Sequence, residues 1–490
     1  MRSADDTGRS LRHQACSEAR GSLDEGDFLA TLERLVAIPT ESQHPEQRHE
    51  LLRYMSDGVG PLLADMGFDL QSFDVDDPAR IPCLLGTRIE SETLPTVMIY
   101  GHGDVVRGLP DQWRDGLDPW RLERQGDKLY GRGTVDNKGQ HLIALQALRA
   151  VLQVRGSLGF NVKFFLDMGE EVGSPGLRSV LSRHREACSA DVFIAFDGPR
   201  LAVGAPEINL GARGVCNLDL VVRLREGTHH SGHWSGLLAD PSILLAHALA
   251  SILSKEGEIL VPGWTPKQIP PAVRQACATL ELEEQDHPKT EPWWGERGLS
   301  RAERIFAWTG VCVLAMQSGR PEAPIHAVQG EARARVSIRH TTDVPSSTFA
   351  PALRAHLVAN GHGHVEVHEI NDDDQFQPAR TDPRHPWVRR IAASMAITAG
   401  RPIHVIPNNS AGNPSSLFEE ELGVPTIWIP YSYPGCEQHG PNEHALVPLL
   451  AEGLELTAGI WWDFGDPEFL ARHGEGADRN FHDGLTSKER

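Results

Sequence analysis

The sequence lacks paired cysteines and long apolar runs. Its seven cysteines are odd in number, scattered and never arranged as C-x-x-C, which argues against a disulfide framework and against a thiolate zinc site. No window reaches the roughly 18 apolar residues that a membrane-spanning helix needs. Residues 1–21 also contain no apolar core of a secretion signal. Together these absences predict a cytoplasmic protein that does not enter a membrane.

Positive charge is also in deficit. The 490 residues include 47 Lys and Arg against 67 Asp and Glu, a formal net charge of −20 with neutral His. Such a surface repels phosphate backbones, so we expect no nucleic acid partner. Hydrophobic residues make up 40% and charged residues 23%, which is ordinary for a globular protein. At this length we expect two domains, which either follow one another or have one inserted into the other.

Hydrophobic patterning divides the chain into two kinds of region. Before residue 213, short continuous apolar runs alternate with helical patterns, which is typical of strands buried on both faces of an α/β sheet. From there to residue 376, strand patterns at 216–224 and 332–338 alternate apolar with mostly polar residues, and helical patterns occur at 241–254 and 345–360. The buried-strand pattern returns at 424–429. An α+β domain is therefore predicted to interrupt an α/β domain.

These patterns give the following domain boundaries. We predict that residues 22–212 and 377–475 form the main α/β domain and that residues 213–376 form the inserted domain. A helix is expected to begin at 22–25. The remaining ends, 1–21 and 476–490, are predicted to be a flexible arm and a flexible tail.

Side chains that bind metals gather at five places in the sequence. Four of them follow apolar strands, where open α/β sheets form their sites: His102 with Asp104, the pair Glu170 and Glu171, then Asp197, and finally His439. The fifth, Asp136, follows a glycine-containing segment and precedes a helix. Each has an ordinary alternative, namely a surface loop, a solvated turn or a helix N-cap. Their joint occurrence in this order favours a common metal site.

Two longer stretches carry a family resemblance. With DPWRLERQGDKLYGRGTVDNKG and MGEEVGSPGL, the chain resembles the M20 family of metallopeptidases from about residue 27 to 465. This family includes carnosinase-like dipeptidases, aminoacylases and carboxypeptidase G2-like enzymes. The resemblance implies a two-metal, exopeptidase-type catalytic domain with a mixed sheet and an inserted α+β lid domain that serves dimerisation.

The resemblance also assigns metal ligands. It implies that Asp136 bridges two divalent metals, that His102 and Asp197 complete one site, and that Glu171 and His439 complete the other. Oxygen and nitrogen ligands without thiolate suit zinc but also accept manganese or cobalt. A cis peptide is expected after the bridging residue, between Asp136 and Asn137.

Three further residues receive catalytic roles from the resemblance. Two cations that share a water lower its pKa, and Glu170 is expected to take that proton as general base and return it to the leaving amine. Asp104 matches the carboxylate that orients His102. The segment 228–232 resembles the family's lid motif, which makes His230 the candidate oxyanion donor. Because this His usually reaches the other subunit's active site, a homodimer through the lid domain is implied.

Substrate recognition is less well determined by the sequence. Arg339 matches the family's substrate-carboxylate clamp, although without the resemblance a solvated strand residue would be the simpler interpretation. Where dipeptidase relatives carry Gly-Gly-Ser preceded by Arg-Glu, this chain has Asn408–Pro414, so one basic contact is missing. Asn413 in this segment is the second candidate for substrate binding.

The sequence therefore predicts a two-metal hydrolase of peptide or amide bonds in small substrates. A dipeptidase is the first hypothesis, and an amidohydrolase of N-acyl or N-aryl amino acids is the alternative. A third hypothesis, from another class, is a catalytically silent relative that uses the fold for binding or assembly. The presence of every expected metal ligand and of Glu170 argues against it.

Overall fold

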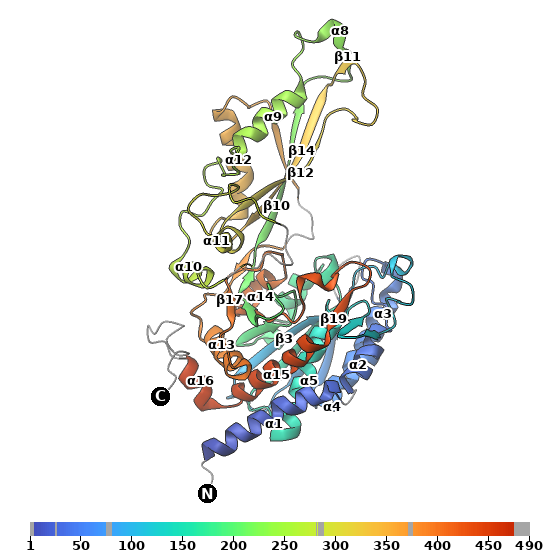
Figure 1. The fold of residues 1–490 in the computed structure, drawn as a ribbon, viewed down its shortest axis with the longest axis vertical. Coiled ribbons are helices and arrows are strands. Elements are labelled where there is room, and N and C mark those ends of the chain that lie inside the picture. Colours follow the sequence, from blue (N-terminus) through green and yellow to red (C-terminus); the bar gives the residue numbers. More distant parts are fainter. Residues whose placement is uncertain are drawn as a thin grey trace.

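The computed structural model describes residues 4–24, 27–74, 81–280, 282, 289–370 and 376–474. Figure 1 shows a broad main domain and an elongated domain that extends away from it. Among the described residues, no helix has both the length and the apolar character required to cross a membrane.

The main domain is built on an eight-stranded mixed sheet. Its central strands β6, β3, β7 and β18 are parallel neighbours, whereas β1 and β2 add antiparallel pairs at one side. The strands, in sheet order, are β1 (Asp69–Phe73), β2 (Cys83–Arg88), β6 (Asn161–Asp167), β3 (Thr96–His102), β7 (Val192–Ala195), β18 (Thr426–Trp428), β8 (Glu207–Asn209) and β17 (His404–Ile406). The predicted mixed α/β sheet is confirmed.

Helices cover both faces of this sheet. Along β3, Val97 and Ile99 pack into a core with residues of α5 and α15, while Met98 and Tyr100 pack into a second core on the opposite face. The first face is covered by α1 (Ala4–Asp24), α2 (Asp27–Val36), α5 (Lys138–Arg155), α13 (Pro386–Ala399) and α15 (Val447–Phe464), and the second by α6 (Leu177–Arg183), α7 (Arg185–Cys188) and α14 (Ser415–Leu422). Burial on both faces explains the continuous apolar runs in the sequence.

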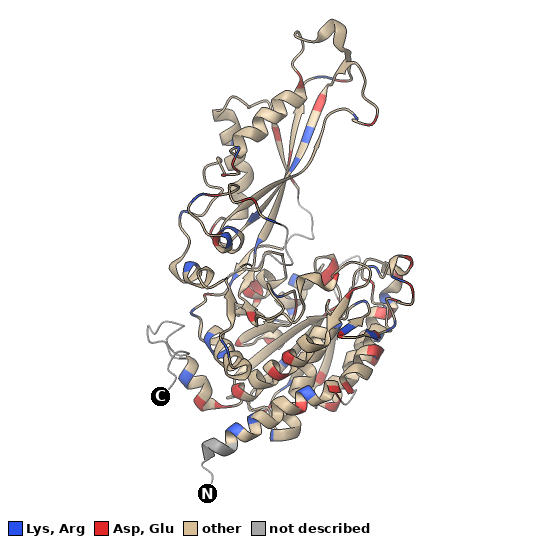
Figure 2. Ribbon diagram, viewed as in Figure 1, with Lys and Arg blue, Asp and Glu red and all other residues tan. Residues whose placement is uncertain are grey.

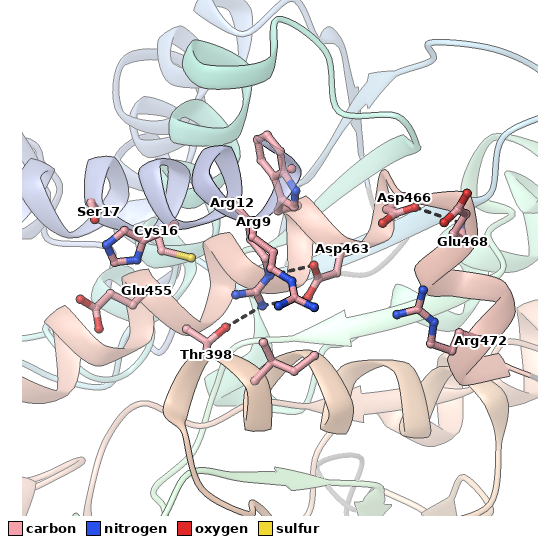
Figure 3. Close-up of a pocket in the computed structure, with 14 residues that line it drawn as sticks. Arg9, Arg12, Cys16, Ser17, Thr398, Glu455, Asp463, Asp466, Glu468 and Arg472 are labelled. Carbon is pink, nitrogen blue, oxygen red and sulfur yellow. Dashed lines mark hydrogen bonds and ion pairs between the residues drawn. The ribbon is translucent and has the colours of Figure 1, made fainter. Parts of the chain in front are cut away.

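The N-terminal segment differs from its prediction. Helix α1 packs on the main domain with Ala15, Ala19 and Leu23 buried, so the prediction of a flexible arm is wrong for residues 4–21. The helix expected to begin at 22–25 is present as α2 and begins at Asp27. Arg12 donates to both carboxylate oxygens of Asp463 at 2.8 Å in a pocket lined by α1, α13, α15 and α16 (Pro467–Gly474), as Figure 3 shows. The segment is polar apart from a few small residues, which is too weak a pattern to predict a docked helix. The tail 476–490 lies outside the described residues.

The elongated domain carries a separate antiparallel sheet. Its order is β12 (Gly310–Gln317), β14 (Glu331–His340), β10 (Gly214–Arg223) and β15 (Glu366–Ile370), and α9 (Pro241–Ile252) and α12 (Phe349–Ala359) pack on one face. At its far end lie β11 (His229–His230), α8 (Ser231–Trp234) and β13 (Ala327–Val328), as Figure 1 shows. The α+β insertion expected from the alternating strands is present, and β12 is a strand that the patterning did not indicate.

One part of the inserted segment packs on the main domain. Helices α10 (Pro271–Cys277) and α11 (Arg301–Phe306) share a small core with Ile406 of β17, and Asn408 Nδ2 donates to the Phe306 carbonyl at 2.6 Å. Nearby, β9 (Gly211–Ala212) pairs with β16 (Ala379–Arg380) where the chain leaves and re-enters the main domain. The two domains are thus joined by packing as well as by the connecting chain.

Candidate two-metal site

The central parallel strands deliver the predicted ligands to one edge of the main sheet. His102 is the last residue of β3, Glu170 and Glu171 lie in a short 3-10 turn after β6, and Asp197 follows β7. Because neighbouring parallel strands end at the same edge, these side chains converge. His439 comes from the loop that precedes β19 (His444–Leu446), and Asp136 from the loop between β5 (Lys128–Tyr130) and α5.

The converging side chains form two groups that share one carboxylate. His102 Nε2 lies 2.9 Å from Asp136 Oδ1 and 3.4 Å from Asp197 Oδ2. His439 Nε2 lies 2.9 Å from Asp136 Oδ2 and 3.2 Å from Glu171 Oε2. Within each group the candidate ligand atoms all lie within 4.8 Å of one another. Asp136 therefore presents one oxygen to each group, the arrangement expected of a bridging ligand.

Burial and close charges shift the pKa values of Asp136, Glu170 and Glu171. Burial opposes ionisation of Asp136, but hydrogen bonds from His102 and His439 outweigh it and lower the pKa of this carboxyl. Burial, reinforced by the charge of Asp136, raises the pKa of Glu171 to about 7, and burial raises that of Glu170 well above its ordinary value. Hydrogen bonds to Asp136 and Glu171 raise the pKa of His439 to about 11. The cluster thus crowds so many carboxyl groups around two imidazoles that Glu170 and Glu171 resist ionisation in the protein alone.

Asp104 holds two parts of the cluster in place. Its carboxylate accepts the backbone N–H groups of Glu170 and Glu171, each at 3.1 Å, and lies 3.4 Å from His102 Nδ1. The same imidazole nitrogen lies 3.1 Å from the Asp104 carbonyl. Its predicted contact with His102 is present, and its hold on the acid pair is an addition that the sequence did not reveal.

A buried ion pair fixes the backbone that carries Asp136. Glu443 accepts the N–H groups of Gly133, Val135 and Asp136 at 3.0, 3.1 and 3.2 Å, and the guanidinium of Arg132 donates to it at 2.5 Å. Both charged side chains are almost fully buried. Arg132 and Glu443 each lie close in sequence to a predicted ligand. No pattern in either segment indicates that the two residues pair across about 300 positions.

Asn137 links the Asp136 loop to the sheet and to a buried chain of polar groups. The Asp136–Asn137 peptide is cis, as the family resemblance implied. The Asn137 amide donates to the Phe196 carbonyl at 2.6 Å, and its oxygen lies 3.1 Å from His141 Nδ1. His141 Nε2 in turn lies 2.9 Å from the Tyr54 hydroxyl. Burial lowers the pKa of His141 to about 3, so this imidazole stays neutral.

The remaining predicted residues lie outside the cluster. His230 is exposed at the far end of the elongated domain, where its Nδ1 accepts the Gly232 N–H at 3.1 Å, so this chain does not bring it to its own cluster (Figure 1). Arg339 lies on β14 near the domain junction. Asn413 is buried, its side-chain oxygen accepts the Ser415 N–H at 3.1 Å, and its amide nitrogen has no partner among the described residues.

The donor set fits two divalent cations. Two imidazoles face three carboxylates, and one carboxylate belongs to both groups. The buried Oε1 of Glu171 has no hydrogen-bond partner in the part of the chain that the structure describes. An unpartnered carboxylate oxygen in such a place is costly unless a cation neutralises it. Oxygen and nitrogen donors without thiolate suit zinc, manganese or cobalt.

Comparison with known proteins is consistent with this geometry. The profile of Peptidase family M20/M25/M40 matches residues 98–463. The chain belongs to this family. The M20 resemblance seen in the sequence is therefore confirmed, and with it a hydrolase that acts on peptide bonds.

Curated relatives of this M20 chain include two dipeptidases. It is 30% identical over 476 residues to the "Beta-Ala-His dipeptidase" of Rattus norvegicus, covering 90% of this chain and 93% of the relative. It is also 30% identical over 445 residues to the "Cysteinylglycine-S-conjugate dipeptidase" of Corynebacterium striatum, covering 88% and 92%.

Solved structures share the fold of this M20 chain. Human carnosine dipeptidase 1 aligns with a TM-score of 0.68 and 22% identity over 92% of this chain and 99% of its own. The dipeptidase Dug1p of Saccharomyces cerevisiae aligns with a TM-score of 0.73 and 17% identity over 93% and 99%. The predicted architecture of a catalytic domain with an inserted lid domain agrees with these neighbours.

Proposed function

We propose that this protein is a two-metal-dependent dipeptidase. The observation that carries the proposal is the single carboxylate of Asp136 placed between two histidine-containing groups at 2.9 Å from each imidazole. The dipeptidases among its relatives support the choice within the family. We propose His102, Asp136 and Asp197 as the ligands of one metal, and Asp136, Glu171 and His439 as those of the other.

Zinc is the metal that we propose for both positions. The nitrogen and carboxylate donors of each group suit zinc, and manganese and cobalt are the alternatives to test. Cations held there would lower the pKa of a shared water and polarise the carbonyl of the scissile bond.

Glu170 is the residue that we propose to move the proton. It neighbours Glu171 in the chain but belongs to neither ligand group, so its carboxylate is available for proton transfer. Its backbone is fixed by Asp104, which holds the side chain beside the cluster. Its carboxylate would take the proton of the attacking water and deliver it to the leaving amine nitrogen.

A homodimer through the lid domain completes the proposal. His230 is exposed at the far end of the lid and does not reach the cluster of its own chain, so an oxyanion-stabilising role requires a second copy. The edge strand β12 offers a surface for pairing, because Val313, Leu314 and Met316 are exposed on it. An unpaired apolar edge is a natural place for strand-to-strand association.

Arg339 and Asn413 are the proposed substrate contacts. Arg339 would hold the free carboxylate of the substrate, and Asn413 offers an unpartnered amide nitrogen within the loop that departs from the dipeptidase pattern. We also propose a cytoplasmic location, supported by seven free cysteines, of which five are buried.

Metal removal and replacement test the proposal. Chelator-treated protein is assayed on a panel of dipeptides and N-acyl amino acids, alone and after addition of zinc, manganese or cobalt. We expect hydrolysis only with metal and faster hydrolysis of the dipeptides. Faster hydrolysis of the acylated half would replace the dipeptidase by an N-acyl amino-acid amidohydrolase with the same catalytic residues. Metal binding without any hydrolysis would favour a silent relative.

A further inference from the structure

Two arginines lie close together at the junction of the domains. In the lid sheet, Arg339 is directly opposite Gly310 on one side and Val215 on the other, so its side chain shares their face. Arg213 immediately precedes β10, and its Nη1 lies 3.6 Å from the position that a Cβ on Gly310 would occupy. The Arg213 guanidinium therefore lies beside Gly310, the residue that pairs with Arg339.

Neither of these guanidinium groups has a counter-ion among the described residues. No hydrogen bond or ion pair involves either side chain, and the Nε of Arg213 is buried without a partner. Burial, reinforced by the charge of Arg339, lowers the pKa of Arg213 to about 10, so both groups stay charged at neutral pH.

Other arginines on the same sheet face are paired. Arg335 donates to both oxygens of Asp219 at 2.7 and 2.9 Å, and Arg333 donates to the Gln317 oxygen at 2.8 and 3.2 Å. Arg213 and Arg339 thus differ from these two arginines, whose guanidinium groups each have a hydrogen-bond acceptor. Two adjacent, partly buried cations without an anion are unfavourable in the protein alone.

The backbone of Arg213 is linked through Asn409 to the loop that carries Asp197. The backbone N–H of Arg213 donates to the Asn409 carbonyl at 3.1 Å. The side-chain nitrogen of Asn409 lies 3.6 Å from the position of a Cβ on Gly198, the residue after Asp197. Next to Gly310, the hydroxyl of Thr309 is buried and also lacks a partner. Among the described residues, the Arg213 Nε and the Thr309 hydroxyl thus lack hydrogen-bond partners at a junction that Asn409 links to the loop of Asp197.

We infer that Arg213 and Arg339 together bind the two carboxylates of an acidic C-terminal residue, so that the preferred substrates end in Asp or Glu. This inference rests on the proposed function, which supplies Arg339 as the clamp for the terminal carboxylate. A planar guanidinium binds a carboxylate through two parallel hydrogen bonds, and two forks match two carboxylates. A substrate with one carboxylate would leave one of the charges unpaired.

The overall charge of the protein does not favour a dianionic substrate, so the selectivity must come from the arginine pair itself. The chain carries a net charge of −20, and Figure 2 shows acidic residues along the helices of the main domain. A dianionic ligand is repelled by that surface at long range, so a paired cationic site is needed to hold it.

Matched substrates test the inference. Metal-loaded protein is assayed on Ala-Glu against Ala-Gln and on Ala-Asp against Ala-Asn, which differ only in the side-chain charge. We expect kcat/KM to be at least about 10-fold higher for the acidic member of each pair, the usual strength of one charge-assisted pair. In Arg213→Gln the preference should disappear through a higher KM for Ala-Glu, with Ala-Gln unchanged. Arg213→Lys, which keeps the charge without the fork, should retain part of it.

The control is Arg335→Gln, which removes a charge already paired with Asp219 on the same face and should leave the preference intact. No preference in the wild type would overturn the inference, as would an equal loss on both substrates in folded Arg213 variants. Binding of L-glutamate against L-glutamine, followed by calorimetry, separates this result from a failure of the proposed function. Tighter glutamate binding that requires Arg213 would uphold the inference even if no peptide is hydrolysed, and equal binding would reject it.

Discussion

The histidine at the edge of the main sheet and the histidine at the far end of the lid differ in burial and in the number of their contacts. His102 is 1% exposed and lies within 3.4 Å of three carboxylates. His230 is exposed, and its ring nitrogen accepts one N–H from its own turn. The first is fixed by its chain before any ligand arrives, whereas the second is presented outward.

This difference shows which parts of the proposed site one chain can build alone. Parallel strands that end at one edge bring distant ligands together without help from another subunit. A histidine at the end of a long lid cannot reach that edge in the same chain, so its proposed role depends on assembly. The two regions should therefore respond differently to mutation and to mixing of subunits.

Glu170→Gln should have the largest effect, because an amide cannot carry the proton. We expect kcat to fall by about 10³-fold or more while the protein still binds its metals. Turnover and metal content per chain are measured together. Glu33→Gln, on the exposed face of α2, is the control and should be neutral. Retained turnover in Glu170→Gln would remove this residue from the mechanism.

His230→Ala should lower kcat by about 10²-fold to 10³-fold if it stabilises the oxyanion. Mixing His230→Ala with Glu170→Gln tests whether it acts across subunits. In half of the sites of a mixed dimer both residues would be native, so reassembly should restore about one quarter of wild-type activity. If the mixture stays inactive although mixed dimers form, His230 does not act in the partner's site.

Leu314→Glu should weaken the proposed dimer, because it places a charge on the apolar edge strand β12. We expect monomers in analytical ultracentrifugation and a loss of activity that increases on dilution. Val358→Glu, at an exposed apolar position of α12, is the matched control and should remain dimeric. Dissociation of both variants, or of neither, would place the interface elsewhere.

The smallest effect is expected for a buried acid of the main domain outside the cluster. Burial raises the pKa of Glu207 from 4.5 to about 7. Its protonated form is the favoured one in the folded state, so stability is highest below pH 4.5 and falls as the pH rises through 7. Glu207→Gln should therefore gain about 1–3 kcal/mol over the wild type at pH 8 and almost nothing at pH 4.5. Urea unfolding at both pH values measures this, and an equal effect at both would show that Glu207 is not protonated on folding.

The sequence predicted the parts of the structure that depend on local pattern. Continuous apolar runs around 97–100 and 162–166 indicated the central strands, and the residues that follow them do converge. The family resemblance added the cis peptide that follows Asp136. For His102, Glu171 and Asp197 the predicted convergence succeeded because neighbouring parallel strands end at one edge of the sheet.

Features that depend on distant contacts were not predictable in this way. Helix α1 is stabilised by a small buried face and by Arg12 bound to Asp463, which its polar composition conceals. Strand β12 exposes most of its residues and therefore lacks the alternating pattern. The partnership of Arg132 with Glu443 depends on tertiary contact between two ordinary loop residues.

That buried partnership also sets an order of events during biosynthesis. The backbone N–H groups of Gly133, Val135 and Asp136 donate to the carboxylate of Glu443, which the ribosome adds about 300 residues later. Until Glu443 has emerged and docked, the loop that carries Asp136 has no anchor for these groups. A nascent chain can therefore fold its first strands without forming a competent hydrolase. We expect hydrolase activity only after the segment that contains Glu443 has been synthesised.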